Sequence, residues 1–373
     1  MLDNQISFAS CHCDNMKVAL ITEFFAPHLG GQEFRFNSFA NALARAGVDV
    51  DVYTIDYTGE LPKQEKCGKF NIYRHVTIKG YSSGTKRNVK DTFAYSLACA
   101  DLIETIHDTY DRIIVNQMPV MHLLYIKPYD NIIVDWCEYW PNGLKHLLLN
   151  RAIKRFRNGI CVSNYILNKL KTVNRSGRFK LFYTPIDTAK YKTGKKKGYS
   201  RMFYLGRLAE HKNIVNLVMA IIAVNENTQN KFSLTIAGEG PLIAAIKKEA
   251  KNHNYIKVLG RISDKDKIRL FKQSDIFAMP SVREGMPNTV LEAIASWLPI
   301  LTVKSKMNNA ASFVKQNGIG LVAEGSSALS IKKSILIFNV AKIEKMRQNE
   351  RKLLKFIDSK DASKKILEII KGG

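Results

Sequence analysis

Two glutamates, Glu284 and Glu292, are separated by seven residues across a glycine-containing loop. The apolar residues before Glu284 indicate a strand, and residues 289–296 indicate a buried helix that begins at this loop. The N–H groups at the start of such a helix face the loop and favour negative charge there. A carboxylate on an apolar helix is costly to bury without a partner, and it could instead accept hydrogen bonds from the hydroxyl groups of a sugar. A capped and paired structural role for Glu292 stays open.

A basic pair, Arg207 and Lys212, follows a predicted strand at residues 202–205 and precedes a predicted helix. A guanidinium fork and an ammonium group at the mouth of a strand–loop–helix turn can neutralise a diphosphate together. The alternative for each residue alone is an exposed side chain in water.

Two further strands end in glycine turns. The first turn contains Gly238 and Gly240, and the second precedes Arg261 and Ile262. A tight turn is the structural interpretation of the first. The backbone of the second could line a flat base.

The first half of the chain opens with a strand, a glycine loop and a helix. Residues 18–22 form a continuous apolar run, Gly30 and Gly31 follow in the loop, and a helical pattern extends to Arg45 before the next strand at residues 48–53. A glycine turn at the carboxyl end of a parallel strand places backbone N–H groups where an anion could bind. The architecture is therefore predicted to be a parallel α/β sheet.

The strand–helix alternation occurs twice along the chain. The remaining predicted strands are residues 112–116, 131–135, 159–162, 180–183, 202–205, 232–237, 255–259, 276–280 and 300–303. A basic, glycine-containing linker at residues 188–200 separates the two series. We therefore expect Rossmann-like domains at residues 1–187 and 188–373, with a flexible leader at residues 1–15 and a helical tail at residues 343–370. Open α/β sheets bind ligands at such a cleft.

Composition narrows the class of protein. The chain has 373 residues, 46% of them hydrophobic, and a formal net charge of +24. Residues 1–187 carry 23 basic and 18 acidic groups, whereas residues 188–373 carry 34 and 15. A charge of this sign attracts phosphates, nucleic acid or an anionic membrane surface.

The longest apolar stretch has eleven residues, whereas a bilayer span needs about twenty. The six cysteines are predicted to be reduced thiols, and Cys11 and Cys13 lack a second ligand pair at zinc spacing.

Taken together, these motifs resemble the family-four retaining glycosyltransferases of the GT-B fold, over residues 17–370. The resemblance rests on Gly30 and Gly31, on the segment from Gly206 to Lys212, on the turn at residues 238–241, and on the glutamate pair. It implies a retaining sugar transfer from a nucleotide-diphosphate sugar to an acceptor. Implied donor-binding residues are Gly30, Gly31, Arg207, Lys212, Gly238, Gly240, Arg261, Ile262, Glu284, Gly285, Met286, Pro287, Asn288, Thr289 and Glu292. Arg207 and Lys212 would clamp the diphosphate, Glu284 would contact the transferred sugar, and Glu292 would bind the ribose.

The chain departs from the family pattern where the acceptor is expected. No histidine follows the strand at residues 131–134, and an acidic segment containing Trp140 and Pro141 stands there instead. Some members that act on lipid-linked polysaccharide precursors carry a similar segment. Asp135 and Glu138 are therefore candidates for the acceptor side, and Asp135 also for catalysis, with a structural role as the alternative. Residues 307–311 replace the family's glycine pair and glutamate, which leaves the sugar open.

Chemically, the resemblance implies a transfer on one face of the sugar, in which the departing diphosphate helps to deprotonate the acceptor hydroxyl. Arg207, Lys212 and the helix N-terminus at Thr289 would stabilise the leaving charge, so we expect no metal and no other cofactor. The alternatives are a GT-B nucleotide-sugar epimerase, a non-catalytic nucleotide-sugar binder, and a nucleic-acid-binding protein. The last is disfavoured because the aromatic residues lie in apolar positions and not among basic ones.

A basic amphipathic segment suggests a place in the cell. Residues 151–180 hold nine basic residues and no acidic one. Residues 144–157, which overlap the start of this segment, show a helical pattern whose apolar positions are Leu144, Leu148, Ala152 and Phe156. Such a helix fits the surface of an anionic membrane, and a solvated helix face is the alternative. We expect a cytoplasmic protein, in peripheral contact with the inner face of the plasma membrane, that acts on a saccharide or lipid-linked acceptor. The base, the sugar, the linkage and the oligomeric state are left open.

Overall fold

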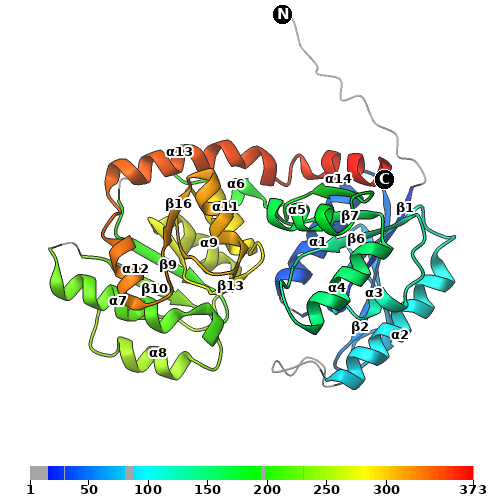
Figure 1. Ribbon diagram of the computed structural model, residues 1–373, viewed down its shortest axis with the longest axis horizontal. Helices are drawn as coiled ribbons and strands as arrows, with labels where there is room; N and C mark the ends of the chain where they lie inside the picture. Colours follow the sequence, from blue (N-terminus) through cyan, green and yellow to red (C-terminus); the bar gives the residue numbers. More distant parts are fainter. Residues whose placement is uncertain (1–15, 29, 80–87, 195–197, 230, 373) are drawn as a thin grey trace, which may run out of the picture. The chain divides into compact units, whose positions relative to one another are not determined.

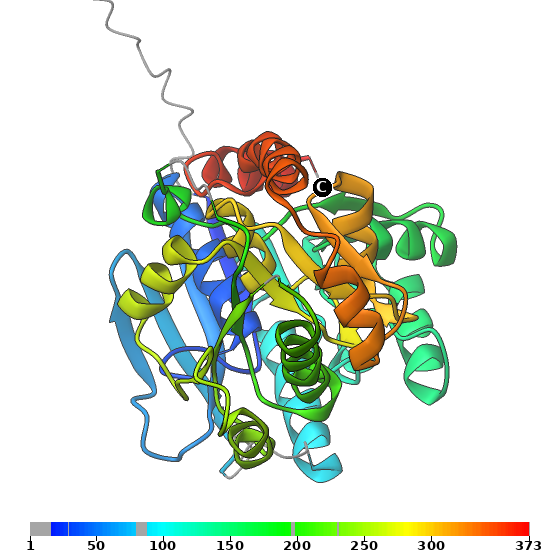
Figure 2. The ribbon, with the colours of Figure 1, turned by 90° about the vertical axis from the view of Figure 1, so that its left-hand side faces the viewer.

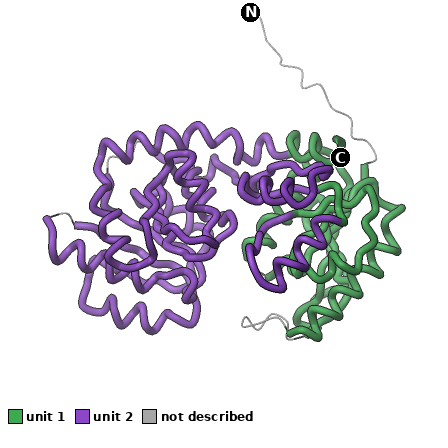
Figure 3. The backbone as a smooth tube through the Cα atoms, viewed as in Figure 1, with its two compact units in different colours: residues 1–135, 155–158, 363–373 green, residues 136–154, 159–362 purple. Residues whose placement is uncertain are grey.

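The computed structural model describes residues 16–28, 30–79, 88–194, 198–229 and 231–372. The predicted leader at residues 1–15, with Cys11 and Cys13, lies outside these residues. The chain divides into two compact units, coloured in Figure 3. Unit 1 comprises residues 1–135, 155–158 and 363–373, and unit 2 comprises residues 136–154 and 159–362.

An eight-stranded sheet with the order β3-β4-β2-β1-β5-β6-β7-β8 is built from the first half of the chain. Its strands are β1 Lys17–Ile21, β2 Asp49–Asp56, β3 Gln64–Cys67, β4 Phe70–Thr77, β5 Arg112–Asn116, β6 Ile132–Trp136, β7 Asn158–Cys161 and β8 Arg178–Leu181. The central pairs are parallel, as predicted. Neither β4 nor its antiparallel partner β3 was predicted.

The helices of this half are α1 Gly31–Arg45, α2 Val89–Ile106, α3 His122–Tyr125, α4 Leu144–Arg155, α5 Asn164–Val173 and α6 Thr188–Tyr191 (Figure 1). Helix α1 forms as predicted, because Phe36, Phe39 and Leu43 recur at helical spacing and are fully buried. It ends before Gly47, whose φ of +81° is the left-handed conformation that favours glycine after a helix. The strand–loop–helix unit after β1 is therefore confirmed.

The apolar face predicted for α4 is only partly correct. Ala152 and Phe156 are buried, but Leu144 is 71% exposed. Leu149 is buried and Leu147 is 65% exposed, although neither was assigned to the predicted face. The helix packs its second half against the protein and leaves leucines of its first turn in water.

A six-stranded sheet in unit 2 has the order β11-β10-β9-β12-β14-β16. Its strands are β9 Arg201–Leu205, β10 Ser233–Ala237, β11 Ile256–Val258, β12 Ile276–Met279, β14 Ile300–Val303 and β16 Gly320–Ala323. All five pairs are parallel, as predicted, although β16 itself was not expected. A short separate pair joins β13 Arg283–Glu284 with β15 Met307–Asn308.

The helices of this half are the 3-10 helix η1 Glu210–Lys212, then α7 Ile214–Asn227, α8 Ile243–Ala250, α9 Asp264–Gln273, α10 Asn288–Ala295, α11 Asn309–Asn317, α12 Ala328–Ile335, α13 Val340–Ile357 and α14 Ala362–Lys371. Figure 2 shows α7 and α12 side by side on one face of the six-stranded sheet. The predicted helix after Glu284 and the helical tail are confirmed as α10, α13 and α14.

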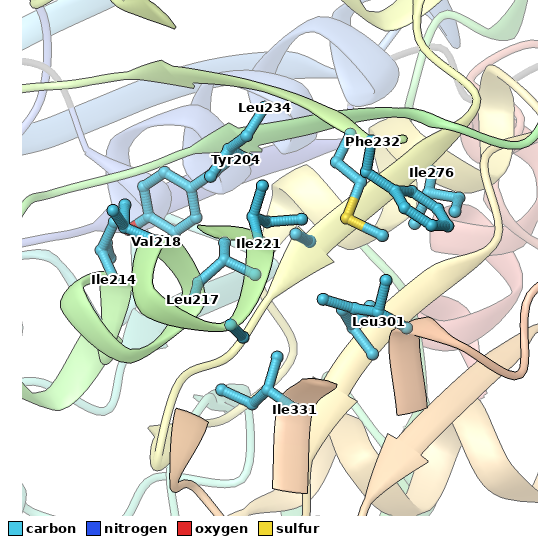
Figure 4. Close-up of a cluster of buried hydrophobic side chains, with 14 of the residues drawn as sticks. Tyr204, Ile214, Leu217, Val218, Ile221, Phe232, Leu234, Ile276, Leu301 and Ile331 are labelled. Carbon is cyan, nitrogen blue, oxygen red and sulfur yellow. The ribbon is translucent and has the colours of Figure 1, made fainter. Parts of the chain in front are cut away.

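The core of unit 2 follows from alternation along β9. Tyr204 packs with Leu217 and Ile221 of α7 in the cluster drawn in Figure 4, whereas Phe203 contacts Phe271 of α9 at a ring distance of 5.1 Å. Successive residues of a strand point to opposite faces, so one strand serves two helical layers. Full burial of each such aliphatic side chain contributes about 1.5–3 kcal/mol. The carboxyl ends of β9, β10 and β12 are thereby fixed.

The last helix belongs to unit 1. Ser363 Oγ of α14 donates to the carbonyl oxygen of Ala42 at 2.7 Å, and Arg112 Nε donates to that of Ile370 at 2.7 Å. The sequence analysis placed this helix in the C-terminal domain. The expected boundary at residue 187 falls between β8 and β9 and stays a prediction. No helix in the described part of the chain has the length and apolar character needed to cross a bilayer.

Candidate functional site

Three loops meet at the carboxyl ends of β9, β10 and β11. The amide of Gly206 donates to the carbonyl of Ala237 at 3.1 Å, and the amide of Gly238 donates to that of Gly260 at 2.7 Å. Gly238 has a φ of +134°, and a Cβ there would lie 1.9 Å from the carbonyl oxygen of Gly206. Only glycine fits so close a backbone approach.

Gly240 follows the same rule. Its φ is +155°, and a Cβ would lie 2.4 Å from the carbonyl oxygen of Leu208. The turn at residues 238–240 therefore fixes the loop that carries Arg207. Donor binding by the two glycines stays a prediction, beside this structural role.

Glu284 is held by a strand pair and a buried amide. It is the second residue of β13, and Asn308 stands opposite it on β15. The Asn308 side chain donates to the carbonyl oxygens of Ser281 and Val303, both at 2.9 Å, and to Thr302 Oγ1 at 3.0 Å. These bonds fix β15, and β15 fixes the backbone of Glu284.

Lys212 comes to Glu284 from η1. Its Nζ is bonded to Glu284 Oε1, and the two side chains are 20% and 13% exposed, respectively. Asn213, which follows at a φ of +58°, turns the chain into α7. Two of the predicted donor-binding residues are thus in direct contact.

This ion pair lines a cavity of about 150 Å³, which we call the ionic cavity. Its lining residues are Glu138, Tyr139, Trp140, His211, Lys212, Arg283, Glu284, Gly285, Met307 and Asn309. Gly285 is needed here, because a Cβ would lie 2.7 Å from the carbonyl oxygen of Cys137. The structure therefore places the predicted acceptor residue Glu138 beside the predicted donor residues Lys212, Glu284 and Gly285.

His211 is a neutral imidazole at the wall of the ionic cavity at neutral pH. Burial lowers its pKa, and the positive charges of Lys212 and Arg283 lower it further. Glu284 acts in the opposite direction but does not outweigh them. The cavity thus combines two cations, two carboxylates and a neutral ring.

The second glutamate, Glu292, is buried on α10 and is 3% exposed. Tyr191 donates a hydrogen bond to its Oε1 at 2.6 Å, and Lys267 Nζ lies 3.0 Å from the same oxygen. Burial lowers the pKa of Lys267, but the charges and hydrogen bonds of Glu292 and Asp264 together outweigh burial and raise it. Among the described residues both contacts use Oε1, which leaves Oε2 to accept from another donor.

The loop between Glu284 and Glu292 leads into helix α10. Met286 is buried, and Pro287 is the N-cap residue of α10. Asn288 begins the helix and Thr289 follows, half-buried. The helix thus begins three residues after Gly285, and its first N–H groups follow the loop, as the sequence predicts.

Of the fifteen predicted donor residues, Lys212, Glu284 and Gly285 line the ionic cavity and the other twelve do not; Arg207, Arg261 and Ile262 are among these twelve. Arg207 and Arg261 are exposed, and Ile262 is half-buried. The charge of Arg207 still reaches His211, whose pKa it lowers. Their donor contacts stay predictions.

Asp135 is in a different setting from Glu138. It is fully buried in unit 1, where Arg35 of α1 donates to both carboxylate oxygens, from Nε to Oδ2 at 2.8 Å and from NH2 to Oδ1 at 2.7 Å. Such a fork-to-fork pair satisfies the carboxylate within the protein. The geometry favours the structural alternative, and its catalytic role is untested.

At the glycine loop of unit 1, Gly30 is the N-cap of α1 in extended backbone. The carboxylate of Glu33 packs against it, since a Cβ on Gly30 would lie 2.4 Å from Glu33 Oε2. His28 Nδ1 lies 2.5 Å from Glu33 Oε1. A carboxylate thus lies at the turn where we expect a phosphate to approach Gly30 and Gly31, and that approach stays a prediction.

Sequence reasoning missed several residues of the site. His211 and Arg283 stand next to predicted residues, so a wider window would have included them. Asn309 lies in the segment that departs from the family pattern. Lys267 and Tyr191 lie far along the chain from Glu292, and only the packing of α6 against both α9 and α10 brings them there.

Residues 185–353 match the family model described as glycosyl transferases group 1. Among curated proteins, EpsF of Bacillus subtilis (strain 168) is 32% identical over 120 residues, which is 32% of this chain and 30% of EpsF. The Campylobacter jejuni enzyme named GalNAc-alpha-(1->4)-GalNAc-alpha-(1->3)-diNAcBac-PP-undecaprenol alpha-1,4-N-acetyl-D-galactosaminyltransferase is 26% identical over 155 residues, or 40% of this chain and 42% of that enzyme. The chain thus spans less than half the length of these two relatives.

A solved structure covers more of the chain. Sucrose-phosphate synthase from Thermosynechococcus elongatus aligns over 96% of this chain and 99% of its own, with a TM-score of 0.76 and 14% identity. This likeness confirms the predicted GT-B fold.

Proposed function

We propose that this chain, whose residues 185–353 match the family model of glycosyl transferases group 1 and whose fold is GT-B, transfers a sugar from a nucleotide-diphosphate sugar to a saccharide acceptor. The observation that carries the proposal is the ionic cavity at the carboxyl ends of the unit 2 strands. It brings together Lys212, Glu284 and Glu138, with the buried Glu292 on the adjoining helix.

On the donor side, Glu292 Oε2 accepts from the ribose hydroxyls, and Lys212 binds the diphosphate. Tyr191 and Lys267 hold the other oxygen of Glu292, so the carboxylate is oriented before the nucleotide arrives. When the diphosphate binds Lys212, the ion pair between Lys212 and Glu284 breaks. Glu284 then accepts a hydrogen bond from a hydroxyl group of the transferred sugar. Arg207 adds a second positive charge from the neighbouring loop.

The transfer retains the configuration at the anomeric carbon. The bond from this carbon to the diphosphate oxygen breaks, a bond to the acceptor oxygen forms on the same face, and the acceptor proton passes to the departing diphosphate. Lys212, Arg207 and the N-terminus of α10 stabilise the leaving charge, so the step needs no metal. Fixed donors of this kind act strongly because they need not reorganise.

The acceptor is a saccharide, and we extend the proposal to one linked to a membrane lipid. The Campylobacter jejuni relative is named for a substrate on diphospho-undecaprenol. In this chain, the exposed Leu144 and Leu147 of α4 stand beside the exposed cations Lys145, Arg151 and Lys154. Apolar tips beside basic residues fit the surface of an anionic bilayer, in the cytoplasm.

The first experiment is a thermal-shift panel with UDP, GDP, ADP, CMP and a DNA duplex. Ligand at a hundred times its dissociation constant stabilises a protein by about 2.7 kcal/mol. We expect one diphosphate to raise the Tm of the parent and of Glu249→Ala, an exposed control in α8, but not of Glu292→Ala or Glu292→Gln. A shift that survives in both Glu292 variants contradicts the site.

Two further results separate the alternatives. Nuclear magnetic resonance of the product reports the anomeric configuration, and an inverted product contradicts retention. Conversion of the donor sugar without an acceptor indicates an epimerase, and nucleotide binding without any turnover indicates a binder. A salt-sensitive shift with DNA alone favours the nucleic-acid alternative.

A further inference from the structure

We propose that a second cavity, between α5 and α11, binds a saccharide unit of the acceptor next to the one that reacts; this rests on the proposed function. The cavity measures about 310 Å³, and we call it the polar groove. Its lining residues are Ser163, Asn164, Tyr165, Asn168, Lys169, Asn309, Ser312, Phe313 and Gln316. Its volume reaches the range of small-molecule sites, which begins at roughly 300 Å³.

Helices α5 and α11 contact each other, and each contributes residues to the lining of the polar groove. On α11, Asn309, Ser312, Phe313 and Gln316 follow each other at spacings of three, one and three residues, which places them on one side of the helix. On α5, spacings of three residues and one residue likewise place Tyr165, Asn168 and Lys169 on one side of the helix. The groove is therefore built by two regular elements.

The chemistry of the lining fits a sugar. Its polar groups are carboxamides, hydroxyls and one ammonium, and this lining contains no carboxylate. Carboxamides and hydroxyls both donate and accept, which matches the hydroxyl groups of a pyranose. Tyr165 and Phe313 add aromatic surface to which the apolar face of a sugar ring can pack. Lys169 is the one cation in this lining, and a single cation neutralises only part of the charge of a diphosphate.

Asn309 gives independent evidence for a ligand. It is 7% exposed and lines both the ionic cavity and the polar groove. Its side chain makes no hydrogen bond within the described residues, whereas the adjacent Asn308 donates three. The Asn309 amide atoms are not among the fully buried atoms that lack a partner in the described residues, so they are accessible from the two cavities, and a ligand hydroxyl can pair with them.

Contacts between aromatic rings and a cation connect the two cavities. Tyr139 lines the ionic cavity and Tyr165 the polar groove, and their rings lie 6.4 Å apart. Lys169 Nζ lies 5.9 Å from the ring centre of Tyr139 and 5.6 Å from that of Tyr165. An acceptor that presents a hydroxyl group in the ionic cavity therefore places its next sugar in the polar groove.

The test measures saccharide binding without any nucleotide. Saturation-transfer difference spectra are recorded for chitobiose, maltose, digalacturonic acid and inorganic pyrophosphate with the full chain. Ser312→Trp fills the groove from an exposed position on α11, and Lys315→Trp places the same ring on an exposed position of α11 outside the groove. We expect at least one disaccharide to bind the parent, about tenfold weaker binding to Ser312→Trp, and no change with Lys315→Trp.

Several outcomes overturn the inference. If no disaccharide binds, or if Ser312→Trp binds as the parent does, the groove holds no sugar. If pyrophosphate alone binds in a manner sensitive to Ser312→Trp, the groove is a phosphate site. A nucleotide shift in the thermal panel without saccharide binding refutes the sugar site in the groove and leaves the proposed function standing. Saccharide binding without any nucleotide shift contradicts the proposed function and leaves the sugar site in the groove standing.

Discussion

Two ion pairs, each with a carboxylate near the carboxyl end of a parallel strand, differ in what surrounds them. Arg35 and Asp135 in unit 1 have side chains that are 3% and 0% exposed, and the guanidinium satisfies both oxygens. Lys212 and Glu284 in unit 2 retain 20% and 13% exposure, and both line a cavity. The Arg35–Asp135 pair, which we call the closed pair, is complete within the protein. The Lys212–Glu284 pair, which we call the open pair, leaves donors and acceptors for a ligand.

The difference shows that an acidic residue at a strand end is not by itself a site. Both Asp135 and Glu284 were selected from sequence for that position. What separates them is the partner and the space beside it, because a guanidinium matches a carboxylate bidentately and an ammonium does not. Predictions that treat the two pairs differently therefore test the assignment.

The largest effect is expected at the closed pair. Asp135→Ala leaves Arg35 buried without its counter-charge, and breaking a buried pair in this way costs about 3–5 kcal/mol of stability. Urea unfolding measures the loss, and Glu138→Ala, an exposed carboxylate of the ionic cavity, is the control with little loss. Unchanged stability together with lost transfer would instead support the catalytic role predicted for Asp135.

The open pair reverses this pattern. Lys212→Ala removes a charge that stabilises the leaving diphosphate, and loss of one such group lowers turnover by about 10²–10³-fold. The free energy of unfolding changes by about 1 kcal/mol or less, because the pair is partly in water. Steady-state kinetics and urea unfolding measure the two effects. Lys304→Ala, which breaks a surface pair with Glu324, is the matched control, and equal losses of turnover in both variants would refute the role of Lys212.

Much of the fold could be predicted because parallel strands in buried sheets are apolar runs. The sequence marks β5 at its observed bounds and β14 likewise. It misses β3, whose four residues Gln64–Cys67 are polar and largely exposed, and β13, whose two residues are a strand only because β15 pairs with them. Strands that owe their existence to a partner carry little signal of their own.

The candidate site was predictable in part for a related reason. Lys212 and Glu284 could be chosen because each follows a strand and accompanies a glycine loop. The partners that decide their state are remote: Arg35 lies 100 positions from Asp135, and Tyr191 lies 101 from Glu292. Hydrogen bonds across such separations come from packing, which no local pattern records.

Two histidines extend the comparison to pH. Burial lowers the pKa of His75 in unit 1 to about 4, and it also lowers the pKa of His211 beside the ionic cavity. Between a lowered folded pKa and the unfolded value of about 6.5, the unfolded chain binds more protons, so stability is complete above pH 6.5 and falls as the pH drops.

For His75 the fall is about 1.4 kcal/mol per pH unit, down to about pH 4. Urea unfolding of the parent and of His75→Leu between pH 4 and 7 measures it, and the variant loses this part of the pH dependence. His211→Asn is the counterpart in unit 2 and alters the pH profile of nucleotide binding instead. If both variants keep the pH dependence of the parent in these measurements, neither histidine is held neutral by its surroundings.

The smallest effect is expected from removal of divalent metal. In the proposed step the leaving diphosphate is met by Lys212, Arg207 and the N–H groups at the start of α10, so its charge is stabilised by groups of the chain itself. Transfer should therefore be the same with excess EDTA as with added Mg²⁺. The informative control is Lys212→Ala. If a metal ion also stabilises the charge of the leaving diphosphate, EDTA abolishes the residual turnover of this variant and Mg²⁺ restores it. Loss of parental activity in EDTA, with recovery in Mg²⁺ or Mn²⁺, would mean that the open pair is not the main partner of the diphosphate and that the contrast with the closed pair has another cause.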